Sequence, residues 1–111
     1  MFLKTENGKY VNIDNIEAVD TMKAKYSDSK DNRYKMMLYS TNDSSYIGAI
    51  YDNKDDAEYA INFLFKHIEN TRGEYLVYNV PTQEDVKIYR FADSINEQVA
   101  KEQERGNHDE Q

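Results

Sequence analysis

The spacing of apolar residues changes once along this chain, near residue 52, and this change constrains the fold more than any other feature. Residues 54–70 place their apolar side chains three and four positions apart, which is the period of an amphipathic α-helix. The stripe consists of Ala57, Ala60, Ile61, Leu64 and Ile68. Asp52 or Asn53 can cap the start of this helix, and Gly73 can end it. We therefore predict one amphipathic helix over about residues 54–70.

Before residue 52 the apolar residues alternate with polar ones, which is typical of β-strands. Asn7 and Gly8 are the strongest short hairpin signal, because a two-residue type I′ turn needs a positive φ at both positions. Polar segments at 27–32 and 42–45 predict further turns. The expected strands are residues 2–4, 10–13, 16–26, 33–41 and 46–51. Strands joined by short loops pair in antiparallel fashion, so we predict an α+β fold, an antiparallel β-meander of about five strands packed by one helix.

The segment after Gly73 has two interpretations. Residues 74–80 are rich in β-formers and residues 86–91 fit a returning strand, which predicts a hairpin followed by a helix capped by Ser94. The other interpretation is one helix from about residue 82 onward. The residues that fit helical spacing there are Val86, Tyr89, Ala92, Ile95 and Val99. We favour the hairpin followed by the helix, and the single long helix stays open as the alternative.

The length of 111 residues is that of one domain, and no linker or repeat divides the chain. We expect a single domain over residues 1–104, with a core at 1–80 and a C-terminal element at 81–104. Residues 105–111 are expected to form a frayed acidic tail.

The formal net charge of −7 argues against direct binding to nucleic acid, because duplex affinity comes largely from Lys and Arg that neutralise phosphates. The last 31 residues carry −4 of this charge. An acidic chain can still bind a protein that is itself basic. No run of about 20 apolar residues predicts a membrane span and no secretory leader is evident, so we expect a cytoplasmic location.

The chain is poor in the groups that enzymes use. It has no cysteine and two histidines, His67 and His108, and it lacks glycine-rich phosphate loops and nucleophile or zinc motifs. Acidic clusters at 28–32 and 52–56 place lysines where calcium ligands would stand. We therefore expect a non-enzymatic protein with no catalytic residue, no metal and no cofactor.

Two groups of residues are candidates for contact with a partner. The acidic group lies at the start of the predicted helix and near the C-terminus: Asp52, Asp55, Asp56, Glu58, Glu97, Glu102 and Glu104. The aromatic group is drawn from ten tyrosines and four phenylalanines: Tyr39, Tyr51, Tyr59 and Phe63. One helix covers only one face of the sheet, so the second face needs the C-terminal segment, a second subunit or a partner to cover it.

Two stretches, residues 4–16 (KTENGKYVNIDNI) and residues 45–61 (SYIGAIYDNKDDAEYAI), resemble small uncharacterised proteins of low-GC Gram-positive bacteria and their phages or plasmids. The resemblance covers about residues 2–68 and rests on structural residues. It implies a β-meander-plus-helix domain and a mobile-element setting, and it transfers no catalytic residue.

Together these observations predict a non-enzymatic protein that binds another macromolecule. A specific form is a small acidic phage or mobile-element inhibitor that occupies the basic nucleic-acid-binding surface of a host protein, with carboxylates in place of phosphates. The alternative is a regulatory or housekeeping module that self-associates as a homodimer through its aromatic sheet face.

Overall fold

The structure, a computed structural model, describes residues 1–24 and 32–109, with side chains described up to residue 103. Its elements in chain order are β1 (Phe2–Lys4), β2 (Tyr10–Asn12), η1 (Ile13–Asn15), β3 (Ile16–Lys23), β4 (Tyr34–Ser40), β5 (Ser45–Tyr51), α1 (Lys54–Thr71), β6 (Val77–Asn79) and α2 (Gln83–Asp109). The α+β class is confirmed. Most of the loop predicted at 27–32 lies outside the described residues.

The strands form two sheets of three strands rather than one meander. In the first sheet β1 lies between β2, to which it is antiparallel, and β6, to which it is parallel. In the second sheet β3, β4 and β5 follow one another as an antiparallel meander. The short helix η1 lies between β2 of the first sheet and β3 of the second. Strand β6 joins β1 from far along the sequence, which local spacing does not predict.

The first hairpin is confirmed, but its turn differs from the expected type I′. Only Gly8 has a positive φ, of 84°, and Asn7 does not. The Gly8 amide donates to the carbonyl of Thr5, and the Thr5 amide donates to the carbonyl of Lys9. This is a three-residue loop that ends on a left-handed glycine, the next commonest way to close a hairpin.

Helix α1 spans Lys54–Thr71, which confirms the predicted helix. The Asn53 side chain caps it by accepting a hydrogen bond of 2.8 Å from the Asp56 amide. The helix ends where Arg72 and Gly73 both adopt left-handed conformations. Its apolar side packs on the second sheet, and the buried side chains of both sheets and both helices form one cluster. Its members are Leu3, Val11, Met36, Leu38, Ala49, Tyr51, Ala57, Ala60, Leu64, Tyr78, Val80 and Val86.

The preferred hairpin-and-helix interpretation of the C-terminal segment is correct in its first strand, which is present as β6, but wrong in the returning strand. Residues 86–91, expected to be a strand, belong to α2, which begins at Gln83 and continues past residue 104 to Asp109. Thr82 and Asp85 start the helix reciprocally: the Asp85 amide donates to the Thr82 hydroxyl (3.2 Å), and the Thr82 amide donates to the Asp85 carboxylate (3.0 Å). This capping box satisfies the free amides of the first turn and favours helix over strand.

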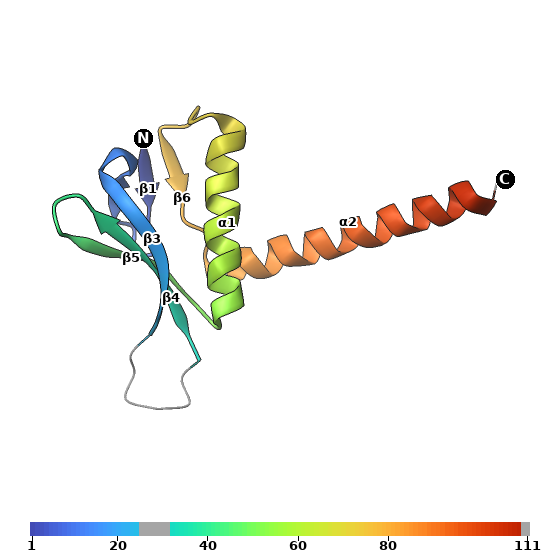
Figure 1. Ribbon diagram of the computed structural model, residues 1–111, viewed down its shortest axis with the longest axis horizontal. Coiled ribbons are helices and arrows are strands. Elements are labelled where there is room, and N and C mark those ends of the chain that lie inside the picture. The colour runs from blue at the N-terminus through green and yellow to red at the C-terminus, as the bar shows by residue number, and fades with distance from the viewer. Residues whose placement is uncertain (25–31, 110–111) are drawn as a thin grey trace.

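Helix α2 leaves the domain beside α1 and extends away from it (Figure 1). Its 27 residues correspond to a length of about 40 Å at 1.5 Å per residue. Among the described residues, no helix is long and apolar enough to cross a membrane.

Candidate protein-binding surface

The base of α2 is fixed to α1 by Asp56, whose side chain is buried between the two helices. The Asp56 carboxylate accepts hydrogen bonds from Arg90 (2.5 Å) and Gln83 (2.9 Å) of α2, and from Asn53 (3.3 Å). Asp56 is 8% exposed, so its charge is largely removed from water. These hydrogen bonds compensate for the hydration that the carboxylate has lost. The first two turns of α2 are therefore held in one orientation relative to α1.

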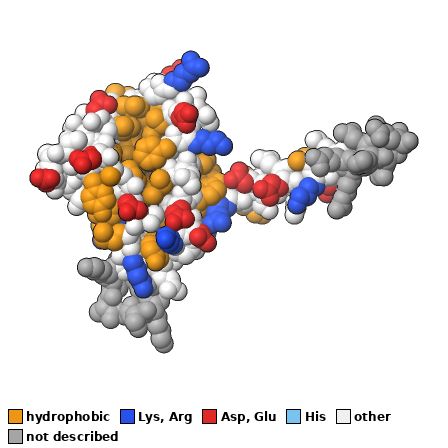
Figure 2. All heavy atoms as spheres, viewed as in Figure 1, with side chains coloured by type: hydrophobic (Ala, Val, Ile, Leu, Met, Phe, Trp, Pro, Cys, Tyr) orange, Lys and Arg blue, Asp and Glu red, His pale blue; other side chains and the backbone are white. Residues whose placement is uncertain are grey.

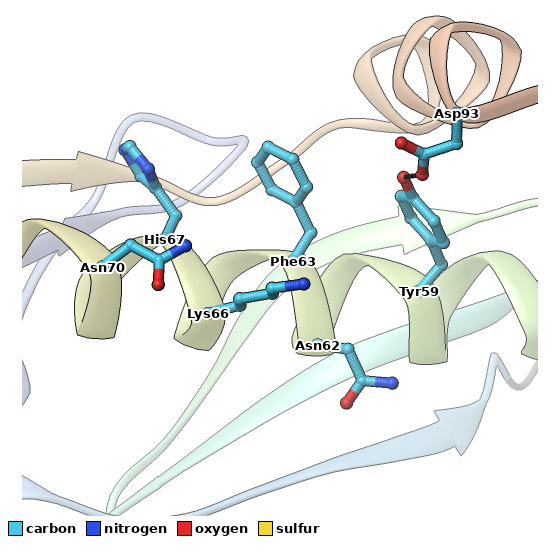
Figure 3. A pocket seen from close by; sticks show the side chains of 7 residues that line it. All are labelled: Tyr59, Asn62, Phe63, Lys66, His67, Asn70 and Asp93. Atoms are coloured by element: carbon cyan, nitrogen blue, oxygen red, sulfur yellow. Dashed lines mark hydrogen bonds between the residues drawn. The ribbon is translucent and has the colours of Figure 1, made fainter. Parts of the chain in front are cut away.

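Aromatic contacts add to this junction. The rings of Phe63 and Tyr89 stack with their centroids 4.1 Å apart, and the Arg90 guanidinium lies 5.5 Å from the centre of the Tyr59 ring. The Tyr59 hydroxyl donates a hydrogen bond to Asp93, which reaches it from α2 (Figure 3). Partial burial and this hydrogen bond raise the pKa of Tyr59 to about 12. The phenol is thus a stable donor over the physiological range.

A third contact positions the start of α2 from the sheet. The Tyr51 side chain is fully buried, and its hydroxyl donates a 2.5 Å hydrogen bond to the carbonyl of Pro81. Burial, with smaller contributions from Glu6 and Asp85, raises the pKa of Tyr51 well above its usual value. Tyr51 ties β5 to the residues that precede α2, so it is a structural residue.

The opposite side of α2 carries an apolar stripe that no described residue covers. The stripe consists of Ile88, Phe91, Ile95 and Val99, which are 59%, 68%, 43% and 46% exposed. Ile95 follows the fully buried Val86 by nine residues, or two and a half helical turns, and so lies about 180° from it. One side of α2 packs on the domain while the other presents large apolar side chains to solvent. Large apolar side chains exposed along one line are typical of interaction surfaces.

Carboxylates stand at both ends of this stripe. Glu84 precedes Ile88 by one helical turn, and Glu102 follows Val99 by three residues, so both lie close to the line of the stripe. Both side chains are exposed, and Asp85 beside Glu84 is partly exposed. Acidic side chains, with basic ones among them, also lie where α2 leaves the domain (Figure 2). The surface is therefore apolar in the middle and acidic at its ends.

The structure separates the predicted acidic residues into different environments. Asp56 is buried in the junction, where its carboxylate accepts a hydrogen bond from Arg90. It is therefore not available to a partner. Asp52, Asp55 and Glu58 are exposed at the start of α1. Two of these have ion-pair partners: Asp52 with Lys87 (3.5 Å) and Glu58 with Lys54 (3.8 Å).

Glu97 and Glu102 are exposed on α2, far along the chain from the α1 group. The side chain of Glu104 lies outside the described part of the structure. The predicted acidic group is therefore not one cluster, because α2 carries its C-terminal members away from the domain.

The predicted aromatic residues also divide. The prediction that Tyr51 contacts a partner is wrong, because its side chain is buried in the core. Tyr59 and Phe63 are half-buried at the junction of α1 and α2, and Tyr39 is half-buried on β4. The second sheet face, which we expected to need a cover, is partly closed, because Met37 is only 7% exposed, although Ile47 remains 37% exposed.

Two hollows lie beside the aromatic row on α1, which consists of the rings of Tyr59, Phe63 and His67. One, of about 390 Å³, is lined by Tyr59, Asn62, Phe63, Lys66, His67, Asn70 and Asp93 (Figure 3). The next, of about 470 Å³, shares Phe63 and His67 and is bounded by β6 and the start of α2. The His67 ring lies 6.2 Å from both Phe63 and Tyr75, as part of an aromatic row. Among the side chains that the structure describes, no three acidic or histidine groups gather as metal ligands do.

No protein-family model, curated protein or solved structure shows a significant match to this chain.

The sequence interpretation placed none of the four stripe residues among the partner contacts, and it left Ile88 and Phe91 out of the helical spacing altogether. Both fall within residues 86–91, which were assigned to a strand, so their helical spacing to Ile95 and Val99 was not used. The signal is present in the sequence: positions 88, 91, 95 and 99 are three, four and four apart. The sequence alone does not show which of the two apolar sides of such a helix the domain covers.

Proposed function

We propose that this protein is a non-enzymatic binding module that docks on another protein through α2. One observation carries the proposal: α2 is held firmly at its base and exposes Ile88, Phe91, Ile95 and Val99 on the side turned away from the domain. A helix with anchors at positions i, i+3, i+7 and i+11 is a common protein-recognition element.

The proposed partner is basic, and the specific form we favour is a nucleic-acid-binding host protein whose basic surface this chain occupies as an inhibitor. The net charge of −7 supports this, as does the position of the exposed acidic residues. The ion pair of Asp52 with Lys87 places the acidic start of α1 against the base of α2. Carboxylates beside an apolar contact raise the rate of association with a basic partner and fix its orientation.

The proposal is tested by capture of a partner from a host lysate with the tagged full chain, at about 0.05 M and 0.5 M salt. Salt screens the attraction between exposed charges that are farther apart than the Debye length, which is about 10 Å or less at such concentrations. We expect a basic protein to be retained at low salt and largely released at high salt. The variant Asp55→Lys/Glu58→Lys should lose retention. The control Glu69→Lys/Glu74→Lys changes the net charge equally at the far end of α1 and should retain the partner. Retention of no protein at low salt contradicts the proposal.

Self-association is the second candidate function. The exposed stripe on α2 is a better surface for it than the aromatic sheet face. Apolar pairing of two α2 helices gives a dimer whose affinity varies little with salt. Sedimentation equilibrium of the purified chain, from micromolar to near-millimolar concentration, distinguishes this from binding to a basic partner.

A further inference from the structure

We infer that α2 inserts as a helix into an apolar groove on the partner protein, and that this groove has basic side chains at both of its ends. The inference rests on the proposed function and names the chemistry of the partner surface. It depends on the length of the stripe, on the charges that bound it, and on the poor fit of a second copy of this chain.

The length of the stripe defines the groove. Ile88 and Val99 are eleven residues apart, which corresponds to about 16 Å along the helix axis. Phe91, at 68% exposed, is the largest anchor and the one that gains most from enclosure in a pocket. A groove about three helical turns long therefore receives all four anchors.

The charges define the ends of the groove. Glu84 and Glu102 lie near the line of the stripe. When a groove encloses the stripe, these two carboxylates therefore contact the partner residues at the two ends of that groove. A carboxylate placed against apolar or acidic groups loses hydration without gaining a partner. Lys or Arg at these two places pairs with it instead, and such pairs determine the register of the helix in the groove.

A second copy of α2 fits this surface poorly. A parallel pair sets Glu84 against Glu84 and Glu102 against Glu102, and an antiparallel pair that aligns the two stripes sets Asp85 opposite Glu102. The contact is also small: four side chains from each helix, on the order of 100 Å² each, bury roughly 800 Å². Stable interfaces bury at least about 1,200 Å². A coiled coil needs apolar heptads over about three or four repeats, and this stripe covers less than two.

The fixed base of α2 favours insertion. Asp56, Tyr59 and Phe63 already orient the helix, so binding does not require a disordered segment to fold. Preorganisation of this kind reduces the entropy lost on association.

The experiment uses the full chain with the photoreactive residue benzoylphenylalanine at position 91, introduced in the native host cells. The matched control carries it at position 100, where Ala100 is exposed but lies well away from the stripe. We expect position 91 to cross-link to a partner segment that has apolar residues in its middle and Lys or Arg at each end. Position 100 should give little or no adduct with that segment.

The partner identified by the cross-link is then purified, and its binding to variants of this chain tests the apolar anchors and the acidic ends of the stripe separately. Ile95→Glu should weaken binding at least about thirtyfold, while Ala100→Glu should change it less than about threefold. Glu84→Lys and Glu102→Lys should each slow association about tenfold at low salt and reduce the dependence on salt. Ile95 is exposed, so the circular dichroism and melting temperature of Ile95→Glu should match those of the wild type.

The outcomes are distinguishable. If Ile95→Glu binds the partner as well as the wild type, the groove and docking through α2 are both wrong, and only binding to a basic protein survives. If no partner is retained at all, binding to a basic protein is wrong as well. A cross-link from position 91 to a second copy, together with a dimer that Ile95→Glu dissociates, overturns the groove in favour of self-association. A partner segment with acidic or apolar ends also overturns it.

Discussion

Helices α1 and α2 have similar amphipathic spacing but different surroundings. The stripe of α1 faces the second sheet, where Ala57, Ala60 and Leu64 are at most 1% exposed. The stripe of α2 faces solvent, and Val86, on the opposite side of the helix, is the one α2 residue in the core among those with described side chains. The same periodicity therefore stabilises the fold in one helix and remains available for binding in the other. The difference arises because α1 lies across a sheet, whereas α2 leaves the domain after its first turns.

The largest expected effect tests this contrast directly. Leu64→Ala leaves a cavity in the core and should lower the free energy of unfolding by about 2–5 kcal/mol. Ile95→Ala removes a similar side chain from an exposed site and should change it by less than about 0.5 kcal/mol. Urea denaturation of both variants measures the difference. Equal destabilisation would show that the stripe of α2 is covered by the chain itself.

Loss of the junction between the helices is the next largest effect. Asp56→Ala leaves Arg90 and Gln83 without their acceptor and should destabilise the protein by about 1–3 kcal/mol. Amide hydrogen exchange in the first turns of α2 should accelerate as well, because the helix loses its main contact with α1. The neighbouring variant Asp55→Ala removes an exposed carboxylate and should leave both measurements near those of the wild type. Unchanged exchange in Asp56→Ala would show that the aromatic stack alone holds α2.

The buried phenol of Tyr51 predicts a loss of stability in alkali. Its pKa in the folded protein is raised above the unfolded value of about 10, so the neutral phenol is favoured by folding. That contribution is complete below about pH 10 and is lost as the pH rises from there toward the folded pKa. Tyr59, with its pKa raised to about 12, adds to the loss in the same direction.

Urea denaturation between pH 8 and 11.5 measures this dependence. The stability of Tyr51→Phe should fall less steeply with pH than that of the wild type. Parallel slopes in the two proteins would show that Tyr51 ionises as readily in the folded state as in the unfolded one.

The smallest effect concerns the start of α2. Thr82→Ala removes the hydroxyl that accepts from the Asp85 amide and should lower stability by about 1 kcal/mol, with Thr82→Ser close to the wild type. Thermal denaturation distinguishes the two. An unaffected Thr82→Ala would indicate that packing of Val86, and not the capping box, decides where the helix begins.

Local patterns predicted much of the fold. The apolar spacing of 54–70 and the cap at Asn53 are features of neighbouring residues, and α1 forms at Lys54–Thr71. The five N-terminal strands follow from alternation and turn residues. The candidate site was harder to predict, because residues 86–91 fit both a strand and a helix. The reciprocal bonds of Thr82 with Asp85, three residues apart, were the local signal that favours the helix.

The sequence by itself determined the class of fold, the position of α1 and an acidic, cysteine-free chain. The tertiary structure alone decided that β6 pairs with β1, that Asp56 and Tyr51 are buried, and that α2 turns one apolar side outward. Periodicity shows which residues share a side of a helix or strand. Which side is buried depends on contacts between segments far apart in the chain, such as Tyr51 with Pro81 and Asp56 with Arg90.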